Sequence, residues 1–153
     1  MTDFVLNEWI WEDVQGRNSR DAFRQAISLI EQFASSSHRL IFISGSRFDD
    51  KAWQVCNARD PLRGRIARIF VLQIRQVSAR ARLLHPSEAP DLPEDLAAVV
   101  DGDDHYLVRA QLAEPGSVLV STDGDLLEAL RNKGIRCMSR DDFFKEYFPA
   151  ALT

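Results

Sequence analysis

Two short acidic stretches of this sequence have the residue types and the spacing to hold a metal ion. The first, residues 101–104, reads DGDD, and the second, residues 121–125, reads STDGD. Carboxylates that converge in a fold repel one another and lose hydration unless they are protonated, solvated or bound to a cation. Ligand sets made only of oxygen atoms suit Mg²⁺ or Mn²⁺. The two stretches would form such a set if folding brings them together.

The helix and strand expected between the two acidic stretches predict that these stretches lie close together in the fold. Residues 103–113 have the pattern of a helix, and the apolar run 118–120 has that of a buried strand. A helix that runs antiparallel to its following strand begins at the strand's carboxyl end, where ligands bind in an open parallel sheet. We therefore expect Asp104 and Asp123 to share one edge of the sheet as metal ligands. Acids also favour helix starts, and we assign that role to Asp103, Asp125 and Asp141.

The whole chain has the pattern of one α/β domain spanning residues 1–153. Apolar runs bounded by turn residues predict strands over 4–6, 40–43, 118–120 and 135–138. Apolar periodicity predicts helices over 19–33, 47–56, 61–84, 93–99, 103–113 and 124–133, and a last one from Ser139 onward. Helical patterns between strands favour a mainly parallel sheet. The prolines of residues 85–93 predict an extended loop there.

The acidic motifs, taken in this order, resemble those of the PIN-domain nucleases. Members of that family pair a helix opening rich in Asp with a later strand that ends in Thr and Asp and precedes Asp-Leu-Leu. Here the residues are Asp101-Gly-Asp103-Asp104 and Thr122-Asp123-Gly-Asp125-Leu126-Leu127, with nineteen residues from Asp104 to Asp123. The order of elements is compatible over almost the whole chain. The resemblance implies a three-layer α/β/α sandwich with a small, mainly parallel sheet, and cleavage of RNA by a divalent metal.

The resemblance also assigns roles to individual acids. Asp104 and Asp123 match the third and fourth acidic motifs of the family, and Asp50, or failing it Asp49, lies nearest to the second. By carry-over, Asp104 and Asp123 would bind Mg²⁺ or Mn²⁺, and Asp50 would join them in catalysis.

The first acidic motif departs from the family pattern. The family has Asp after its first strand, whereas this chain has Asn7 followed by Glu8. Glu8 could supply the missing carboxylate as a catalytic metal ligand, and Asp13 is a more distant substitute. Asn7 could still offer its side-chain carbonyl oxygen to a metal, although it brings no negative charge. Residues that would orient ligands or water around this group are Asn7, Ser44 or Ser46, Asp101, Thr122 and Asp125.

Charge is distributed unevenly along the chain. Residues 59–82 contain seven arginines and one acid, whereas residues 88–128 contain eleven acids and one base. One interpretation is that the arginine stems cover a helix face and pair with acids elsewhere. The other is a surface for a polyanion or a partner. In that case Arg65, Arg68 and Arg75 would contact the RNA substrate, an antitoxin, or a second copy in a homodimer.

Composition and cysteine content argue against a membrane-spanning protein and against a disulfide-rich secreted one. The chain has 153 residues, is 45% hydrophobic and 27% charged, and has a net charge of −4, as in an ordinary globular domain. No apolar run is long enough for a membrane span, and the two cysteines, in apolar contexts, favour a reducing cytoplasm over a disulfide framework.

The resulting hypothesis is a single-domain, Mg²⁺- or Mn²⁺-dependent endoribonuclease, of toxin–antitoxin type if the family's common role holds. The alternative, prompted by Asn7, is a catalytically weakened PIN-like module that binds RNA or protein. A receiver-like signalling domain fits less well, because no lysine follows the last strands at the position such a domain needs. His105 is more simply a surface residue than a base, and Trp9, Trp11 and Trp53 are more simply core or interface anchors than base-stacking platforms.

Overall fold

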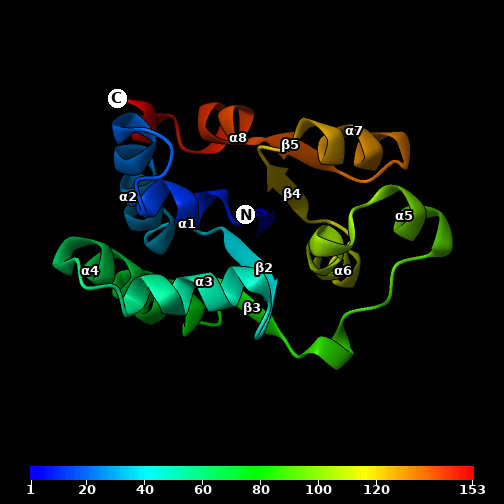
Figure 1. Ribbon diagram of the computed structural model, residues 1–153, viewed down its shortest axis with the longest axis horizontal. Coiled ribbons are helices and arrows are strands. Elements are labelled where there is room, and N and C mark those ends of the chain that lie inside the picture. Colours follow the sequence, from blue (N-terminus) through cyan, green and yellow to red (C-terminus); the bar gives the residue numbers. More distant parts are fainter.

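Five parallel strands form the centre of the molecule. The computed structural model describes residues 1–153, and Figure 1 shows helices packed around the sheet. The strand order is β3-β2-β1-β4-β5, and every neighbouring pair is parallel. The strands are β1 (Asp3–Leu6), β2 (Arg39–Ile43), β3 (Ala81–Leu84), β4 (Val118–Ser121) and β5 (Cys137–Ser139).

Eight α-helices connect and cover these strands. They are α1 (Trp9–Val14), α2 (Arg20–Ala34), α3 (Arg47–Cys56), α4 (Pro61–Phe70), α5 (Glu94–Val99), α6 (His105–Ala113), α7 (Gly124–Asn132) and α8 (Arg140–Tyr147). A π-helical turn, η1 (Val71–Arg75), extends α4, and short 3₁₀ turns are η2 (Pro86–Glu88), η3 (Gly102–Asp104) and η4 (Pro149–Leu152). None of these helices combines the length and apolar character needed to cross a bilayer.

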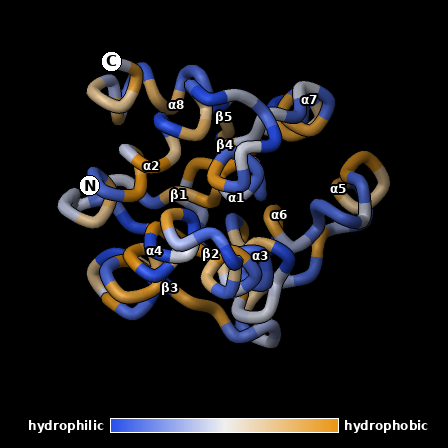
Figure 2. Tube along the Cα trace, turned by 60° about the vertical axis from the view of Figure 1, so that its left-hand side comes forward, coloured by the Kyte–Doolittle hydropathy of each residue, from blue (hydrophilic) through white to orange (hydrophobic).

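Alternating side chains of the strands feed two hydrophobic cores, one on each face of the sheet. On β1, Phe4 and Leu6 join the larger core, which α1, α2, α3, α4 and α8 complete, while Val5 joins a smaller core under α5, α6 and α7. The strands are largely hydrophobic along their length (Figure 2), as expected for strands buried on both faces. The predicted three-layer α/β/α sandwich with a parallel sheet is therefore confirmed.

The segment 61–84 differs from its prediction as one long helix. The α-helix ends at Phe70, η1 continues it to Arg75, and the chain then enters the edge strand β3. Leu40–Ile43 of β2 pair in register with Ala81–Leu84, so tertiary pairing overrides the helical periodicity of the arginine-rich sequence. The prediction of four strands was one strand short for the same reason.

The N-terminal tryptophans lie in a short helix that the apolar pattern did not indicate. Trp9 and Trp11 belong to α1 and are fully buried. Trp11 packs edge-on against Phe70 of α4, with ring centroids 4.7 Å apart. These two side chains are core anchors, as preferred from the sequence.

The order of strands places a topological switch point between β1 and β4. The chain proceeds from β1 to β2 and β3 on one side, and then returns to place β4 and β5 on the other side of β1. Helices that leave β1 and β4 diverge at such a switch point, and ligands of open parallel sheets bind beyond the carboxyl ends of the strands there.

Candidate functional site

Asp104 and Asp123 meet at this edge of the sheet, as predicted. They line one cavity of about 190 Å³ together with Asp101, Asp125 and the apolar side chains of Val99, Val100 and Leu126. Asp123 follows β4, whereas Asp104 lies nineteen residues earlier, as the last residue of η3 and the N-cap of α6. The fold thus brings four carboxylates from two distant segments around one small opening.

Asp123 is held by the start of α7. As the N-cap of that helix, its Oδ1 accepts hydrogen bonds from the backbone N–H groups of Asp125 (3.0 Å) and Leu126 (3.2 Å). Its own N–H donates to Ser121 Oγ at 3.0 Å. One carboxylate oxygen is therefore fixed by the helix, and Oδ2 makes no hydrogen bond within the chain.

Asp104 is the acid of the site whose pKa is raised by its surroundings. It is half-buried at the start of α6, and its side chain makes no capping hydrogen bond. Burial raises the pKa of this carboxyl, and the negative charges of Asp123, Asp101 and Glu8 raise it further, against a smaller opposing effect of Arg47. A raised pKa means that the ionised side chain lacks sufficient positive charge or hydration around it.

Asn7 ties β1 to β4 at the base of the site. Its Nδ2 donates to Ser121 Oγ at 3.1 Å, and its backbone N–H donates to the Val120 carbonyl at 3.1 Å. Its Oδ1 already accepts the Glu8 N–H at 2.7 Å. This residue, which the sequence allowed as an oxygen donor, is thus used first as a structural link between the two strands.

Glu8 is surrounded by basic side chains of α3 that the sequence analysis did not identify. Its Oε1 lies 3.1 Å from Arg47 Nε and 3.8 Å from Lys51 Nζ. Arg47 also reaches Asp103, with Nη1 3.3 Å from Oδ2. Only a weak indication of this contact was present in the sequence. Arg47 is the first residue of α3, directly after its N-cap Ser46 and close to the end of β2.

Tyr106 is a second residue that the sequence analysis missed. Its hydroxyl is buried and has no hydrogen-bond partner within the chain. Burial and the charges of Glu8 and Asp104 raise the pKa of this phenol. The hydroxyl therefore stays protonated and donates to no group of the fold.

The second acidic motif is divided between two very different environments. Asp49 is 2% exposed and binds Arg75 through both oxygens, at 2.8 and 2.9 Å. Its Oδ2 also accepts the N–H of Gly45, whose positive φ of 73° forms the turn after β2. Asp50 is exposed on α3 and does not line the cavity that holds Asp104 and Asp123. The structure therefore does not bring Asp50 into the group around Asp104.

Other residues singled out from the sequence have simpler roles. Asp103, Asp125 and Asp141 lie in first helical turns, as assigned. Ser44 is half-buried after β2 and Thr122 is exposed after β4, and neither side chain bonds to an acid of the site. Asp13 forms a buried ion pair with Arg140, 2.9 Å apart, and so is no substitute for the first motif.

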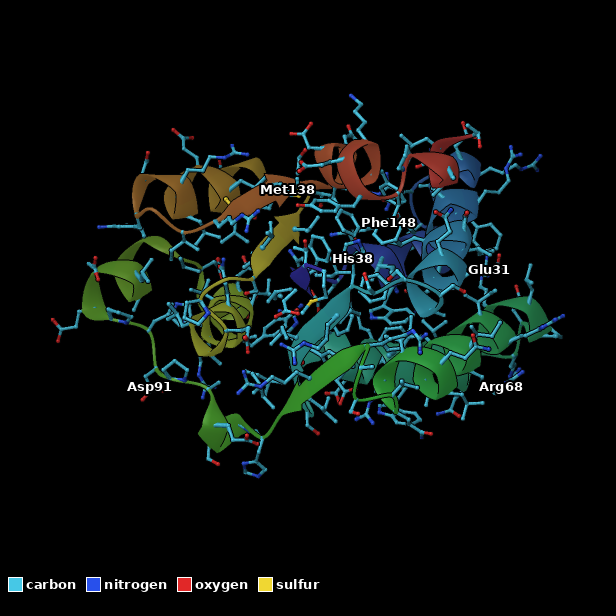
Figure 3. All side chains as sticks on the ribbon, turned by 180° about the vertical axis from the view of Figure 1, so that it is seen from behind. Glu31, His38, Arg68, Asp91, Met138 and Phe148 are labelled. Carbon is cyan, nitrogen blue, oxygen red and sulfur yellow. The ribbon has the colours of Figure 1, made fainter.

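The arginine-rich segment is partly used inside the fold. Arg75, expected to contact RNA, is committed to Asp49 and to the ring of Trp53, 5.0 Å from its guanidinium. Ion pairs also engage Arg63 with Asp60 and Arg82 with Glu114. Within residues 59–82, the exposed arginines that form no ion pair are Arg59, Arg65 and Arg68. Figure 3 shows Arg68 at the outer edge of the molecule, on α4.

The side chains of the site are of the chemical type that binds a hard divalent cation. They are not positioned as a complete set of ligands around one point. Carboxylate oxygens are suitable ligands for Mg²⁺ or Mn²⁺. No three His, Cys, Asp or Glu side chains of the chain are as close together as metal ligands. Binding would require Glu8, Asp104 and Asp123 to turn toward one point, and Glu8 would have to loosen its contacts with α3.

Comparisons with known proteins add no assignment: no protein-family model matches the chain, and no significant match was found among curated proteins. The functional interpretation therefore depends on the motifs and on the geometry of this edge of the sheet.

Proposed function

We propose that this chain is a divalent-metal-dependent endoribonuclease of PIN-like type. The observation that carries the proposal is the convergence of Asp104 and Asp123 on one cavity at the switch point of a parallel sheet. A carboxyl whose pKa is raised within a cluster of acids, as that of Asp104 is, is typical of sites that need a bound cation or a proton. The acidic motifs that resemble PIN-domain nucleases fall on this edge of the sheet.

Three side chains would hold Mg²⁺ or Mn²⁺: Glu8, Asp104 and Asp123. When bound, the cation would lower the pKa of a coordinated water and neutralise charge at the scissile phosphate. Asp123 supplies an oxygen from a carboxylate already oriented by α7. Asp101 and Asp125 add negative charge at the rim of the cavity, and Asn7 and Ser121 hold the two strands that carry the ligands together.

RNA is the proposed substrate because the site combines acidic side chains with basic side chains nearby. A phosphodiester would be repelled by four carboxylates unless a cation lies between them. Arg47 and Lys51 lie beside the acids, within ion-pairing distance of Glu8, and can bind the phosphates that flank the scissile one. Both cysteines are free, which agrees with the cytoplasmic location that we propose for such an enzyme.

A cleavage assay tests this proposal. The protein should cleave a mixture of structured and single-stranded RNAs in Mn²⁺ or Mg²⁺ and lose that activity in EDTA. Asp104→Asn and Asp123→Asn should each reduce the rate by about a hundredfold or more, since they remove charge that binds the cation. Glu146→Gln, at an exposed acid without an ion pair, is the matched control. Metal-independent cleavage, or equal activity in all variants, would exclude this mechanism.

A second candidate function is binding without catalysis, and the outer face of α4 favours it. Leu62 is 48% exposed and Leu72, in η1, is 62% exposed, and the unpaired Arg65 and Arg68 lie between them in the sequence. Interfaces are enriched in arginine and depleted in acids. This face would bind an acidic partner, such as an antitoxin, or an RNA backbone.

Two variants separate these functions. Arg65→Ser with Arg68→Ser should weaken binding of a labelled oligouridine or an acidic partner peptide, while Asp104→Asn should leave that binding intact. If binding survives loss of both arginines, the face of α4 is not the binding surface.

A further inference from the structure

Arg47 lies between two acids that come from different elements. Its Nε is 3.1 Å from Glu8 Oε1, and its Nη1 is 3.3 Å from Asp103 Oδ2. Glu8 follows β1, Asp103 lies in η3, and Arg47 opens α3. The charge of Glu8, and to a smaller extent that of Asp103, raises the pKa of the guanidinium. Arg47 is therefore a cation supplied by the fold to the acids of the site.

Glu8 is the acid that this arrangement affects most. Lys51, one turn along α3, lies 3.8 Å from Glu8 and 3.5 Å from Glu12. A divalent cation would meet Glu8 already paired with two basic side chains, whereas Asp104 and Asp123 form no ion pair in the chain. Arg47 and a metal thus compete for the same carboxylate.

The environment of Arg47 allows it to change partners. Its side chain is 52% exposed, and exposed ion pairs contribute little net free energy. A guanidinium binds phosphate oxygens through two parallel N–H groups, with a geometry as favourable as its geometry toward a carboxylate. A phosphate at this edge of the sheet would therefore be a suitable alternative partner.

We propose that Arg47 is a substrate-positioning residue that exchanges Glu8 for an RNA phosphate. In the metal-free protein it neutralises Glu8 and Asp103. When the site is loaded, Arg47 releases Glu8, and its guanidinium binds a phosphate next to the scissile bond. This inference rests on the proposed function and adds a residue that no acidic motif indicates.

The first test is the affinity for Mn²⁺, measured by calorimetry at low ionic strength. Arg47→Gln removes the competitor and should bind Mn²⁺ roughly two- to fivefold more tightly than the native chain. Arg24→Gln removes an exposed arginine paired only with Asp21 on α2, 3.2 Å away, and should leave the affinity unchanged. Arg47→Lys keeps the charge without the planar fork and should resemble the native chain in Mn²⁺ affinity.

The second test is the affinity for a phosphorothioate-linked oligouridine in Mn²⁺. Arg47→Gln should bind this RNA more weakly, and the slope of log affinity against log salt should fall by about 0.7, the value for one lost phosphate contact on a single strand. Arg47→Lys should retain the slope but lose part of the affinity, because it cannot form two parallel hydrogen bonds.

The outcomes separate the inference from the proposed function. If the native chain binds Mn²⁺ but Arg47→Gln binds it no more tightly, the partner exchange is wrong and the metal site stands. If only Arg47→Gln binds Mn²⁺, the competition is correct, but the native chain is not a metal enzyme. If no variant binds Mn²⁺, both proposals are overturned. An unchanged salt slope in Arg47→Gln would overturn the phosphate contact.

Discussion

At the scale of one residue, the carboxyl of Asp104 lowers the stability of the folded chain when it is ionised. Burial and the nearby charges of Asp123, Asp101 and Glu8 raise its pKa in the folded protein. A carboxyl whose folded pKa exceeds its unfolded value binds protons more strongly when folded. Its ionisation therefore lowers the stability of the metal-free protein as pH rises through the folded pKa.

Replacement of Asp104 by Asn should stabilise the metal-free protein. In EDTA near neutral pH, we expect a gain of roughly 0.5 to 1 kcal/mol, since the change removes a partly solvated repulsion. The thermal midpoint should rise by roughly 1 to 4 °C for a chain of this size. Glu146→Gln should change it by less than about 1 °C. A lower midpoint for Asp104→Asn would show that the ionised carboxylate is stabilised in the fold.

His38 gives a second, independent dependence on pH. Its Nδ1 accepts the Thr2 N–H at 3.1 Å, and its ring lies among Phe4, Tyr147 and Phe148. Burial, with the charge of the N-terminus, lowers its pKa below the ordinary 6.5. The unfolded chain thus binds more protons at this residue, so its contribution to stability is present above pH 6.5 and is lost as pH falls from there through the lower pKa of the folded protein.

Urea denaturation across this pH range measures the effect. The free energy of unfolding should fall as the solution is acidified through the histidine range, and His38→Gln should reduce that slope even though it loses ring contacts. His85→Gln alters an exposed histidine and should keep the native slope. Equal slopes in all three proteins would show that His38 titrates alike in the folded and unfolded chains.

Among the elements, α8 is joined to α1 by a buried ion pair. Arg140 Nε lies 2.9 Å from Asp13 Oδ2, and the guanidinium also covers the rings of Trp9 and Phe144, at 5.3 and 4.5 Å. Its Nη2 donates to Gln25 Oε1 of α2 at 3.0 Å. One arginine at the end of β5 thus connects three helices of the larger core.

Arg140→Met should destabilise the protein by roughly 3 kcal/mol, because it leaves Asp13 buried without its counter-charge. Adding Asp13→Asn should recover part of this loss, since the orphaned charge is then absent. Arg24→Met, at an exposed pair, should cost less than about 0.5 kcal/mol. Denaturant midpoints give all three values. A loss below about 1 kcal/mol for Arg140→Met would show that water reaches the pair.

Helices and strands could be predicted from the sequence where a local apolar pattern defines them. They were missed where strand pairing or packing against distant residues defines them. The stripe of α2 and its cap Ser19 were readable, and so were the strands that became β2 and β4. The edge strand β3 was hidden by arginines that continue the helical period, and only its pairing with β2 defines it. The helix α1 is too short for a periodic signal, and packing of its two tryptophans stabilises it.

Part of the candidate site could also be predicted from the sequence, and part of it depended on tertiary packing. Asp104 and Asp123 follow from the rule that helix starts and strand ends share an edge, which any parallel sheet obeys. Arg47 and Tyr106 did not follow, since their approach to Glu8 depends on how α3 and α6 pack beside β1. Asp49 and Asp50 are adjacent in sequence, yet one is buried against Arg75 and the other is exposed. Only the rotation of α3 distinguishes them.

The whole molecule has two cores that share one sheet, so both should unfold together. Trp9 and Trp11 report on the larger core, and Cys137 packs against the smaller one. In a Cys56→Ser variant, tryptophan fluorescence and the thiol reactivity of Cys137 should therefore give one urea midpoint. Reactivity of Cys137 at lower urea would show that the layer of α5, α6 and α7 opens separately, contrary to a single domain.

The central claim is that Asp104 and Asp123 together bind a divalent cation, and calorimetric titration with MnCl₂ tests it most directly. The native chain should bind Mn²⁺ near neutral pH, and Asp104→Asn and Asp123→Asn should each lose that binding while Glu146→Gln retains it. Asn also caps helices, so Asp123→Asn should keep α7 folded. A native chain that takes up no Mn²⁺, or one whose affinity survives both substitutions, would contradict the account.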